Sequence, residues 1–243
     1  MDWGNLMRLA IFTGGSRGLG AALCKIFKDN GFELIEFSRS APYPYSVQTD
    51  LSDPGSASAK FSEALSVLSA KTWKEIVVFN NAGTILPVGP TGKKEPKSII
   101  QNANINYTSA LLFITEVVSA FQDHKCKKTL VNISSGAAKS VRYGWSLYCA
   151  AKAGMENFIR ALANEQSRET HPFTVVNINP GLVDTEMQTT IRNTSKEDFP
   201  DKDLFLKRKE KGELRNPRET ASELFRIVEE YSLENGSSIS LAF

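Results

Sequence analysis

The stretch R-L-A-I-F-T-G-G-S-R-G-L-G, residues 8–20, decides the fold of this chain. A largely apolar run is followed at once by a glycine-rich turn and then by apolar residues at helical spacing. In such a turn Gly14 permits the tight bend, Gly18 lets the backbone approach a pyrophosphate, and Gly20 allows the helix to pack closely. The phosphates would meet the amides at the start of the helix. The cofactor contacts predicted here are Gly14, Ser16, Arg17, Gly18, Leu19 and Gly20.

Strands and helices alternate along the rest of the chain. We expect further strands at 33–38, 47–49, 75–80, 129–134, 173–179 and 238–242, and helices up to residue 30 and at 52–70, 99–121, 146–168 and 219–233. This alternation predicts a parallel sheet covered by helices on both faces, because right-handed crossovers place them there. No linker or repeat is visible, so residues 1–243 are expected to form one α/β domain, a doubly wound Rossmann fold of about seven strands.

One long connection, residues 186–217, breaks the alternation and is rich in Lys, Asp and Glu. A connection of this length is either a functional lid or disordered. Its apolar residues Phe199, Leu204, Phe205 and Leu206 give it something to bury. The sequence therefore favours a substrate lid that contains short helices.

Composition excludes several classes of protein. The 243 residues carry a net charge of +2, which implies no nucleic-acid or membrane partner, and the apolar runs are too short to span a bilayer. No apolar signal segment follows Asp2. The scattered cysteines Cys24, Cys126 and Cys149 suit a reducing cytoplasm, and His124 with Cys126 lacks the further ligands of a metal site. We expect a cytoplasmic protein without a metal.

A second stretch, V-N-I-S-S-G-A-A-K-S-V-R-Y-G-W-S-L-Y-C-A-A-K-A-G-M at 131–155, carries reactive groups. Tyr148 and Lys152 are four residues apart and share one face of a helix. A phenol has a pKa of about 10, which a nearby ammonium group would lower towards working pH for acid/base catalysis. Ser135 ends a strand, where its hydroxyl could hold a carbonyl oxygen. A surface tyrosine beside a solvated lysine would show the same spacing.

The residues after the second strand indicate which cofactor binds. An acidic residue there would bind the ribose 2′-hydroxyl of NAD, but the chain has Ser38, Arg39 and Ser40. Arg39 and Arg17 offer guanidinium groups for a 2′-phosphate, although both could be plain surface residues. The turn 80–83, N-N-A-G, could tie down the glycine turn and let the ribose approach at Gly83, or it could be an ordinary turn.

Together these motifs resemble the classical short-chain dehydrogenase/reductase family. The resemblance covers nearly the whole chain, with the motifs in the family's order and spacing. It implies Tyr148 as proton donor, Lys152 as ribose ligand that lowers the Tyr148 pKa, Ser135 as carbonyl ligand and Asn106 as holder of a water relay. The cofactor contacts that it adds are Ser38, Arg39, Asp50, Leu51, Asn81, Ala82, Gly83, Tyr148, Lys152, Pro180, Gly181, Val183 and Thr185.

Within that family the chain is most similar to sepiapterin reductases and bacterial benzil reductases. The shared features are S-S-G-A-A-K, G-W-S-L-Y-C, V-D-T-E-M-Q followed by I-R, and the charged segment 186–217. Those enzymes reduce a carbonyl beside another oxygenated carbon with NADPH. The tail 237–243, S-S-I-S-L-A-F, lacks the aspartate that anchors a pterin in sepiapterin reductases, which favours an aromatic or smaller dicarbonyl. Trp145 and Met187 are expected to form pocket walls together with Ser135 and Tyr148, although Trp145 could simply pack at the helix start.

Three functions remain open from the sequence. The first is an NADPH-dependent carbonyl reductase acting on a small molecule. The second is a 3-oxoacyl thioester reductase, which is expected to lack G-W-S-L-Y-C and the charged segment. The third is a non-catalytic NADP-binding regulator, which predicts a broken Ser/Tyr/Lys set. The resemblance also implies a homodimer through two helices per subunit, whose apolar faces carry Leu111, Val118, Phe158 and Leu162.

Overall fold

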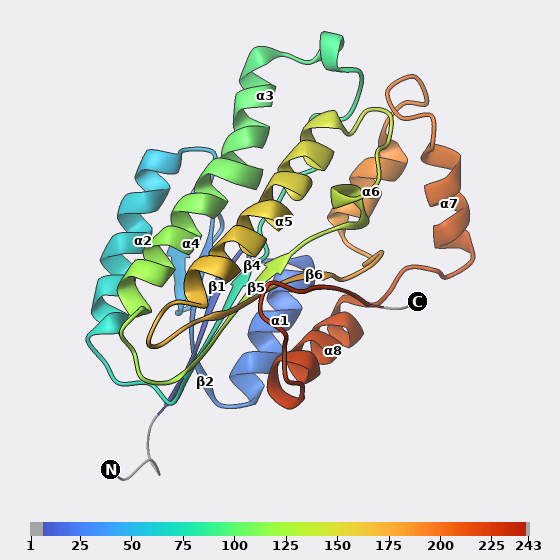
Figure 1. The fold of residues 1–243 in the computed structure, drawn as a ribbon. Coiled ribbons are helices and arrows are strands. Elements are labelled where there is room, and N and C mark those ends of the chain that lie inside the picture. Colours follow the sequence, from blue (N-terminus) through green and yellow to red (C-terminus); the bar gives the residue numbers. More distant parts are fainter. Residues whose placement is uncertain (1–6, 242–243) are drawn as a thin grey trace.

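The computed structural model describes residues 7–241. It contains one seven-stranded sheet in the order β3-β2-β1-β4-β5-β6-β7, in which every pairing is parallel (Figure 1). The strands are β1 (Arg8–Thr13), β2 (Phe32–Ser38), β3 (Ser46–Gln48), β4 (Glu75–Asn80), β5 (Lys127–Ile133), β6 (Thr174–Asn179) and β7 (Ser238–Ser240). The strand order grows outward in both directions from the β1–β4 pair. The predicted doubly wound, single-domain Rossmann fold is therefore confirmed.

Helices cover both faces of this sheet. They are α1 (Gly18–Asp29), α2 (Pro54–Ser69), α3 (Pro96–Ala103), α4 (Ser109–Phe121), α5 (Ser146–Gln166), α6 (Glu186–Asn193), α7 (Lys202–Glu210) and α8 (Pro217–Glu230). Figure 1 shows α2, α4 and α5 on one face and α1 with α8 on the other. Helix α2 begins at Pro54, two residues later than predicted, because Asp53 caps it: its side chain accepts a hydrogen bond from the Ser56 amide.

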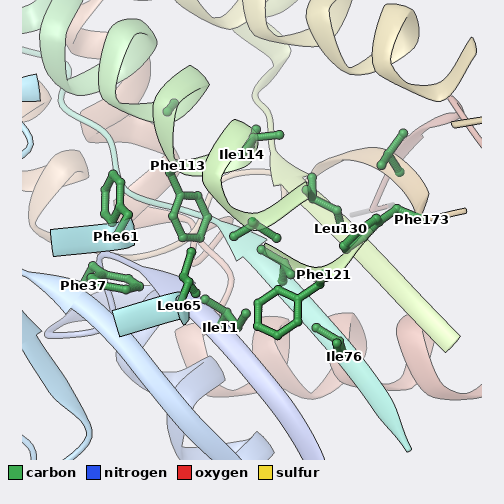
Figure 2. Packing of buried hydrophobic residues seen from close by; sticks show 14 of the residues in the cluster. Ile11, Phe37, Phe61, Leu65, Ile76, Phe113, Ile114, Phe121, Leu130 and Phe173 are labelled. Atoms are coloured by element: carbon green, nitrogen blue, oxygen red, sulfur yellow. The ribbon is translucent and has the colours of Figure 1, made fainter. Parts of the chain in front are cut away.

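The two faces carry separate apolar cores because side chains alternate along each strand. Ile11 of β1 points into the core under α2, α4 and α5, whereas its neighbour Phe12 points towards α1 and α8. In the first core the Phe61 ring packs edge-on against Phe37 and Phe113, at 4.9 and 5.3 Å (Figure 2). Since both faces of the central strands are fully buried, the sheet is a rigid base for whatever projects from its edges.

The helix predicted at 99–121 differs in the structure. It begins earlier, at Pro96, and a π-helical turn, Asn104–Thr108, divides it into α3 and α4. A π turn inserts one extra residue into a helix, and the apolar residues on either side of it still recur at helical spacing, so the sequence pattern predicted one continuous helix. Asn106 lies inside this turn and is buried.

The predicted short helices of residues 186–217 are present as α6 and α7. Phe199 and Phe205 are buried, and the Phe199 ring stacks on Trp145 with 5.1 Å between ring centroids. The expectation that Leu204 and Leu206 are also buried is wrong, because both stay exposed on the outer side of α7. Two phenylalanines are therefore the buried apolar anchors of the segment from Phe199 to α7.

The end of the chain is simpler than predicted. The last strand spans Ser238–Ser240 rather than 238–242, and residues 242–243 lie outside the described part. Within residues 7–241 no helix is long and apolar enough to cross a bilayer. The thiols of Cys24, Cys126 and Cys149 are free.

Candidate active site

The predicted site residues converge on one cleft of about 1670 Å³. It runs along the carboxyl edge of the sheet, where the strand order reverses and α/β proteins bind their ligands. The predicted residues that line it are Gly14, Ser16, Arg17, Gly18, Leu19, Gly20, Ser38, Arg39, Asp50, Leu51, Asn81, Ala82, Gly83, Ser135, Trp145, Tyr148, Lys152, Pro180, Gly181, Val183, Thr185 and Met187. Asn106 is the one predicted site residue that does not line it.

The glycine turn at one end of the cleft is shaped for an anion. A Cβ on Gly20 would lie 2.0 Å from the Gly14 carbonyl oxygen, and Gly14 itself has a φ of 71° and leaves no room for a Cβ beside Ala82. The Asn81 amide donates to the carbonyls of Thr13 and Gly14, each at 3.1 Å. Helix α1 has no side-chain cap and no acidic residue in its first turn. Its first amides are therefore available to a bound phosphate.

The two predicted arginine ligands lie in different situations. Arg39 is exposed at the end of β2 and lines the cleft near Asp50, whose pKa is lowered mainly by a hydrogen bond from the Ser52 amide and further by the Arg39 charge. Arg17 in the glycine turn instead forms an ion pair with Glu186 at the start of α6. Both partners of that pair are largely exposed, so the contact is open to exchange with another anion.

Ser135, Tyr148 and Lys152 meet at the centre of the cleft. Ser135 follows β5, and the other two residues are one turn apart on α5, with Tyr148 and Lys152 both buried. The Lys152 ammonium donates to the Ile133 carbonyl at 2.7 Å and lies 5.7 Å from the centre of the Tyr148 ring. The chemical set that the sequence predicted is thus assembled by one helix and the end of one strand.

Burial controls the electrostatics of this set. It raises the pKa of Tyr148 to about 12, against a hydrogen bond from Ser135 that lowers it. The expectation that Lys152 lowers the Tyr148 pKa is therefore wrong for this structure, because desolvation of the phenolate dominates. Burial also lowers the pKa of Lys152 to about 8, while the Glu156 charge opposes that change.

Glu156 is a site residue that sequence reasoning missed. Its buried carboxylate lies one helical turn beyond Lys152 on α5 and accepts a hydrogen bond from the Ser134 hydroxyl at 2.6 Å. The signal was present in the sequence, because Tyr148, Lys152 and Glu156 follow one another at intervals of four residues. The carboxylate supplies a negative charge that favours the protonated form of Lys152.

A ladder of buried amides under the site was also missed. The Asn80 amide donates to Asn132 at 2.9 Å, and Asn132 donates to Asn177 at 2.8 Å, across β4, β5 and β6. The Thr13 hydroxyl donates to the Asn80 carbonyl oxygen at 3.3 Å and extends the ladder to β1. An asparagine near the end of three buried strands was the available signal. The ladder fixes the strand ends from which the glycine turn, Asn81 and Ser135 project.

The implied role of Asn106 as holder of a water relay stays a prediction. The Asn106 side chain accepts from the Thr84 amide and donates to the Thr84 carbonyl, each at 2.8 Å. These two hydrogen bonds hold the side chain in place behind the cleft. The structure shows Asn106 fixing the segment after β4, next to Gly83, where a Cβ would lie 3.3 Å from the Asn106 oxygen.

The far end of the cleft has aromatic walls. Trp145 is 7% exposed, lies edge-on to Tyr148 with 6.0 Å between ring centroids, and stacks on Phe199. Trp145 therefore both packs at the start of α5 and lines the cleft, so the two alternatives that the sequence left open do not exclude each other. Met187 of α6 lines the same region.

The fold and this site define a class of enzyme. The model of the short chain dehydrogenase family matches residues 8–196, and the chain belongs to that family. It is an oxidoreductase, and its family uses a nicotinamide cofactor.

Individual relatives place the chain within the family. It is 36% identical over 235 residues to a benzil reductase ((S)-benzoin forming) of Bacillus subtilis (strain 168), covering 95% of this chain and 96% of the relative. A benzil reductase of the same description from Bacillus cereus is 32% identical, covering 97% and 99%. The sepiapterin reductase of Bos taurus is 28% identical, covering 95% and 93%. The resemblance to these two groups of reductases is confirmed.

Solved structures agree on the fold. The KRED1-Pglu enzyme superposes with a TM-score of 0.80 at 24% identity, covering 96% of this chain and all of that one. A short chain dehydrogenase from Burkholderia cenocepacia J2315 in complex with NADP gives a TM-score of 0.73 at 18% identity, covering 97% and 88%. At these identities the likeness concerns the fold alone.

Proposed function

We propose that this protein is an NADPH-dependent reductase of a ketone that lies next to another oxygenated carbon, such as an aromatic α-dicarbonyl. The observation that carries the proposal is the junction of Ser135, Tyr148 and Lys152 in the same cleft as the uncapped start of α1 and Arg39. A phosphate-binding end and a proton-donating centre in one cleft fit a dinucleotide-dependent reduction.

Several features of the cleft support NADP(H) as the cofactor. Gly14 and Gly20 let the turn pack closely against Ala82 and the start of α1, and the first amides of α1 would bind the diphosphate. Arg39 would bind the 2′-phosphate, since β2 ends in Ser38 and not in a carboxylate. Asp50, Leu51, Asn81, Ala82, Gly83, Pro180, Gly181, Val183 and Thr185 would line the remaining length of the cofactor.

The chain's own groups have distinct roles in this proposal. The bound nicotinamide would supply the hydride. Ser135 would donate a hydrogen bond to the substrate oxygen, and the Tyr148 hydroxyl would donate its proton to that oxygen. The pKa of Tyr148, raised to about 12, keeps the phenol protonated at neutral pH, so the proton to be donated is present. Lys152 would bind the ribose of the cofactor through its ammonium group.

An aromatic dicarbonyl is favoured over a pterin. The cleft wall near Tyr148 is apolar, with Trp145, Met187, Ile85 and Ile191. The two benzil reductases cover nearly the whole chain at the higher identities. Leu241, near the end of the chain, is buried in the core and offers no anchor for a pterin.

Turnover of a substrate panel tests the proposal. NADPH absorbance is followed with benzil, sepiapterin and an acetoacetyl thioester, and the Michaelis constants of NADPH and NADH are compared. We expect benzil to give the highest kcat/KM and NADPH to be preferred. Preference for the thioester would support the acyl reductase instead, and binding of NADPH without any turnover would support the regulator.

Three further features belong to the same proposal. We propose that residues 186–217 act as a lid over the substrate, because Phe199 and Phe205 pack them against Trp145 beside Tyr148.

A homodimer would form through the half-buried Leu111, Val118 and Phe158 on α4 and α5, and sedimentation tests it. Leu162 is not part of that face, because the structure buries it in the core. The free thiols support a cytoplasmic location.

A further inference from the structure

Glu36 is a charged residue in the core that the proposed reaction does not use. It lies in the middle of β2 and has no exposed surface. Placing a carboxylate there is costly unless hydrogen-bond donors satisfy it. The structure provides such donors from three separate segments, all at the same end of the cleft.

Each donor comes from a segment that borders the adenosine half of the predicted cofactor site. The Gly15 amide of the glycine turn donates to Glu36 Oε2 at 3.1 Å. The Ser38 hydroxyl, at the end of β2, donates to Oε1 at 2.9 Å. The hydroxyl of Ser46, paired with Glu36 across β2 and β3, also donates to Oε1. One carboxylate thus joins the glycine turn to Ser38 and Ser46, which stand at the two ends of the connection between β2 and β3, residues 39–45.

Gly15 has no side chain, and this leaves room for Glu36 beside the glycine turn. A Cβ on Gly15 would lie 3.0 Å from both Glu36 Cβ and Oε2, and 2.6 Å from the Cys24 sulfur. The need for glycine here comes from close approach and not from a positive φ, which Gly15 does not have. The turn sits directly against the carboxylate, so its amide can reach it.

Ser38 and Ser46, which bind Glu36, also accept hydrogen bonds from the connection at residues 39–45. The Ala41 amide donates to Ser38 Oγ at 3.2 Å, and the Tyr43 amide donates to Ser46 Oγ at 3.2 Å. Arg39 lies in this connection and lines the cleft. Two hydroxyls held by Glu36 therefore help to fix the connection that carries Arg39, together with the Gln48 side chain, which donates to the Arg39 carbonyl at 3.1 Å.

We propose that Glu36 is a positioning residue for the cofactor's phosphates: it holds the diphosphate-binding turn and the Arg39 connection at a fixed separation. This inference rests on the proposed NADP(H) function. Fixing both sites before binding lowers the ordering cost of binding and so raises affinity. A negative charge near a phosphate would by itself weaken binding. Positioning and simple charge therefore predict opposite effects when the charge is removed.

The test is Glu36→Gln, which keeps the side-chain size but cannot accept from all three donors. Dissociation constants are measured by titration for NADPH, for NADH, which lacks the 2′-phosphate, and for 2′,5′-ADP, which lacks the diphosphate bridge. We expect about a tenfold loss of NADPH affinity and losses for both other ligands, while kcat at saturating NADPH changes less than about twofold. Glu33→Gln on the same strand, whose partner is the exposed Lys71, is the matched control and should change none of these values.

Two further variants keep the proposal open to refutation. Ser46→Ala removes one of the two donors on the Arg39 side and leaves the glycine turn's donor in place, so it should weaken 2′,5′-ADP and leave NADH within about twofold. This variant decides the matter should Glu36→Gln fail to fold by circular dichroism. A folded Glu36→Gln protein that binds NADPH as tightly as the wild type, or more tightly, overturns the positioning role. Wild-type protein that binds no NADPH instead overturns the proposed function, so the two failures are distinguishable.

Discussion

Different forces hold in place the edge of the sheet that carries the proposed catalytic residues and the proposed lid, residues 186–217. At the edge, Lys152 and Glu156 are buried and bonded to the Ile133 carbonyl and the Ser134 hydroxyl, above the ladder of amides. The lid relies on exposed ion pairs such as Arg17–Glu186 and Lys196–Asp203, and on the packing of Phe199 and Phe205 against Trp145.

In this contrast the edge of the sheet would carry the reacting groups, and the lid would control the entry of the substrate. Exposed ion pairs contribute about 0–1 kcal/mol each, whereas a buried aromatic side chain contributes several times more. The edge therefore has a single arrangement, and the lid can open if its aromatic contact is lost. Changes at the edge should alter kcat or pH behaviour, while changes in the lid should alter substrate KM.

The largest effect is expected from Tyr148→Phe. The ring and its packing stay, and only the proton donor is lost, so kcat should fall about 10²–10⁴-fold while NADPH affinity stays within about twofold. Steady-state kinetics and cofactor titration check both values. A variant that kept more than about a tenth of the wild-type kcat would require another proton donor.

Lys152→Met tests how far burial of the Lys152 ammonium group affects the stability of the protein. The folded pKa of Lys152 is about 8 against an ordinary 10.5, so between these values the unfolded chain binds more protons and wild-type stability rises with pH. The cost of the buried charge is present in full below pH 8 and is relieved as the pH approaches 10.5.

The Lys152→Met variant lacks this dependence of stability on pH, because it has no ammonium group at this position. The free energy of unfolding of the wild type, relative to Lys152→Met, should increase by up to about 3 kcal/mol across that window. Urea denaturation at several pH values measures it. Parallel pH curves for the two proteins would show that Lys152 is not desolvated in the way the structure indicates.

Phe199→Ala should loosen the lid. Losing the stack on Trp145 leaves α7 with Phe205 as its remaining buried anchor, so we expect substrate KM to rise about tenfold with little change in kcat. Trypsin should cleave the lysine-rich α7 faster than in the wild type. Leu204→Ala, on the exposed side of the same helix, is the control, and equal cleavage rates in the two variants would contradict this role of Phe199.

The smallest effect is expected from Glu186→Gln. The Arg17–Glu186 pair is exposed on both sides, so thermal stability should be unchanged and NADPH affinity should rise by no more than about threefold as Arg17 is released. Titration at low and high salt checks this. A loss of affinity, or a clear loss of stability, would show that the lid depends on its ion pairs after all.

The sequence was most informative where the chemistry is local. The glycine turn, the spacing of Tyr148 and Lys152, and the apolar alternation predicted the fold and the reactive residues that line the cleft. Sequence reasoning failed where a residue's role depends on partners far along the chain. Asn132 and Asn177 acquire a role only when β5 and β6 pair in register, and Leu162 faces the core because of how α5 packs.

By itself the sequence determined the order of strands and helices, the glycine turn and the reactive residues, because these depend on backbone sterics and side-chain chemistry within a few positions. Only the tertiary structure decided the ionisation of those residues and the supports beneath them. Burial raises the pKa of Tyr148 and lowers that of Lys152, and no local pattern encodes how much water surrounds a side chain. The contact between Glu36 and Gly15 likewise exists only because β2 packs beside the turn.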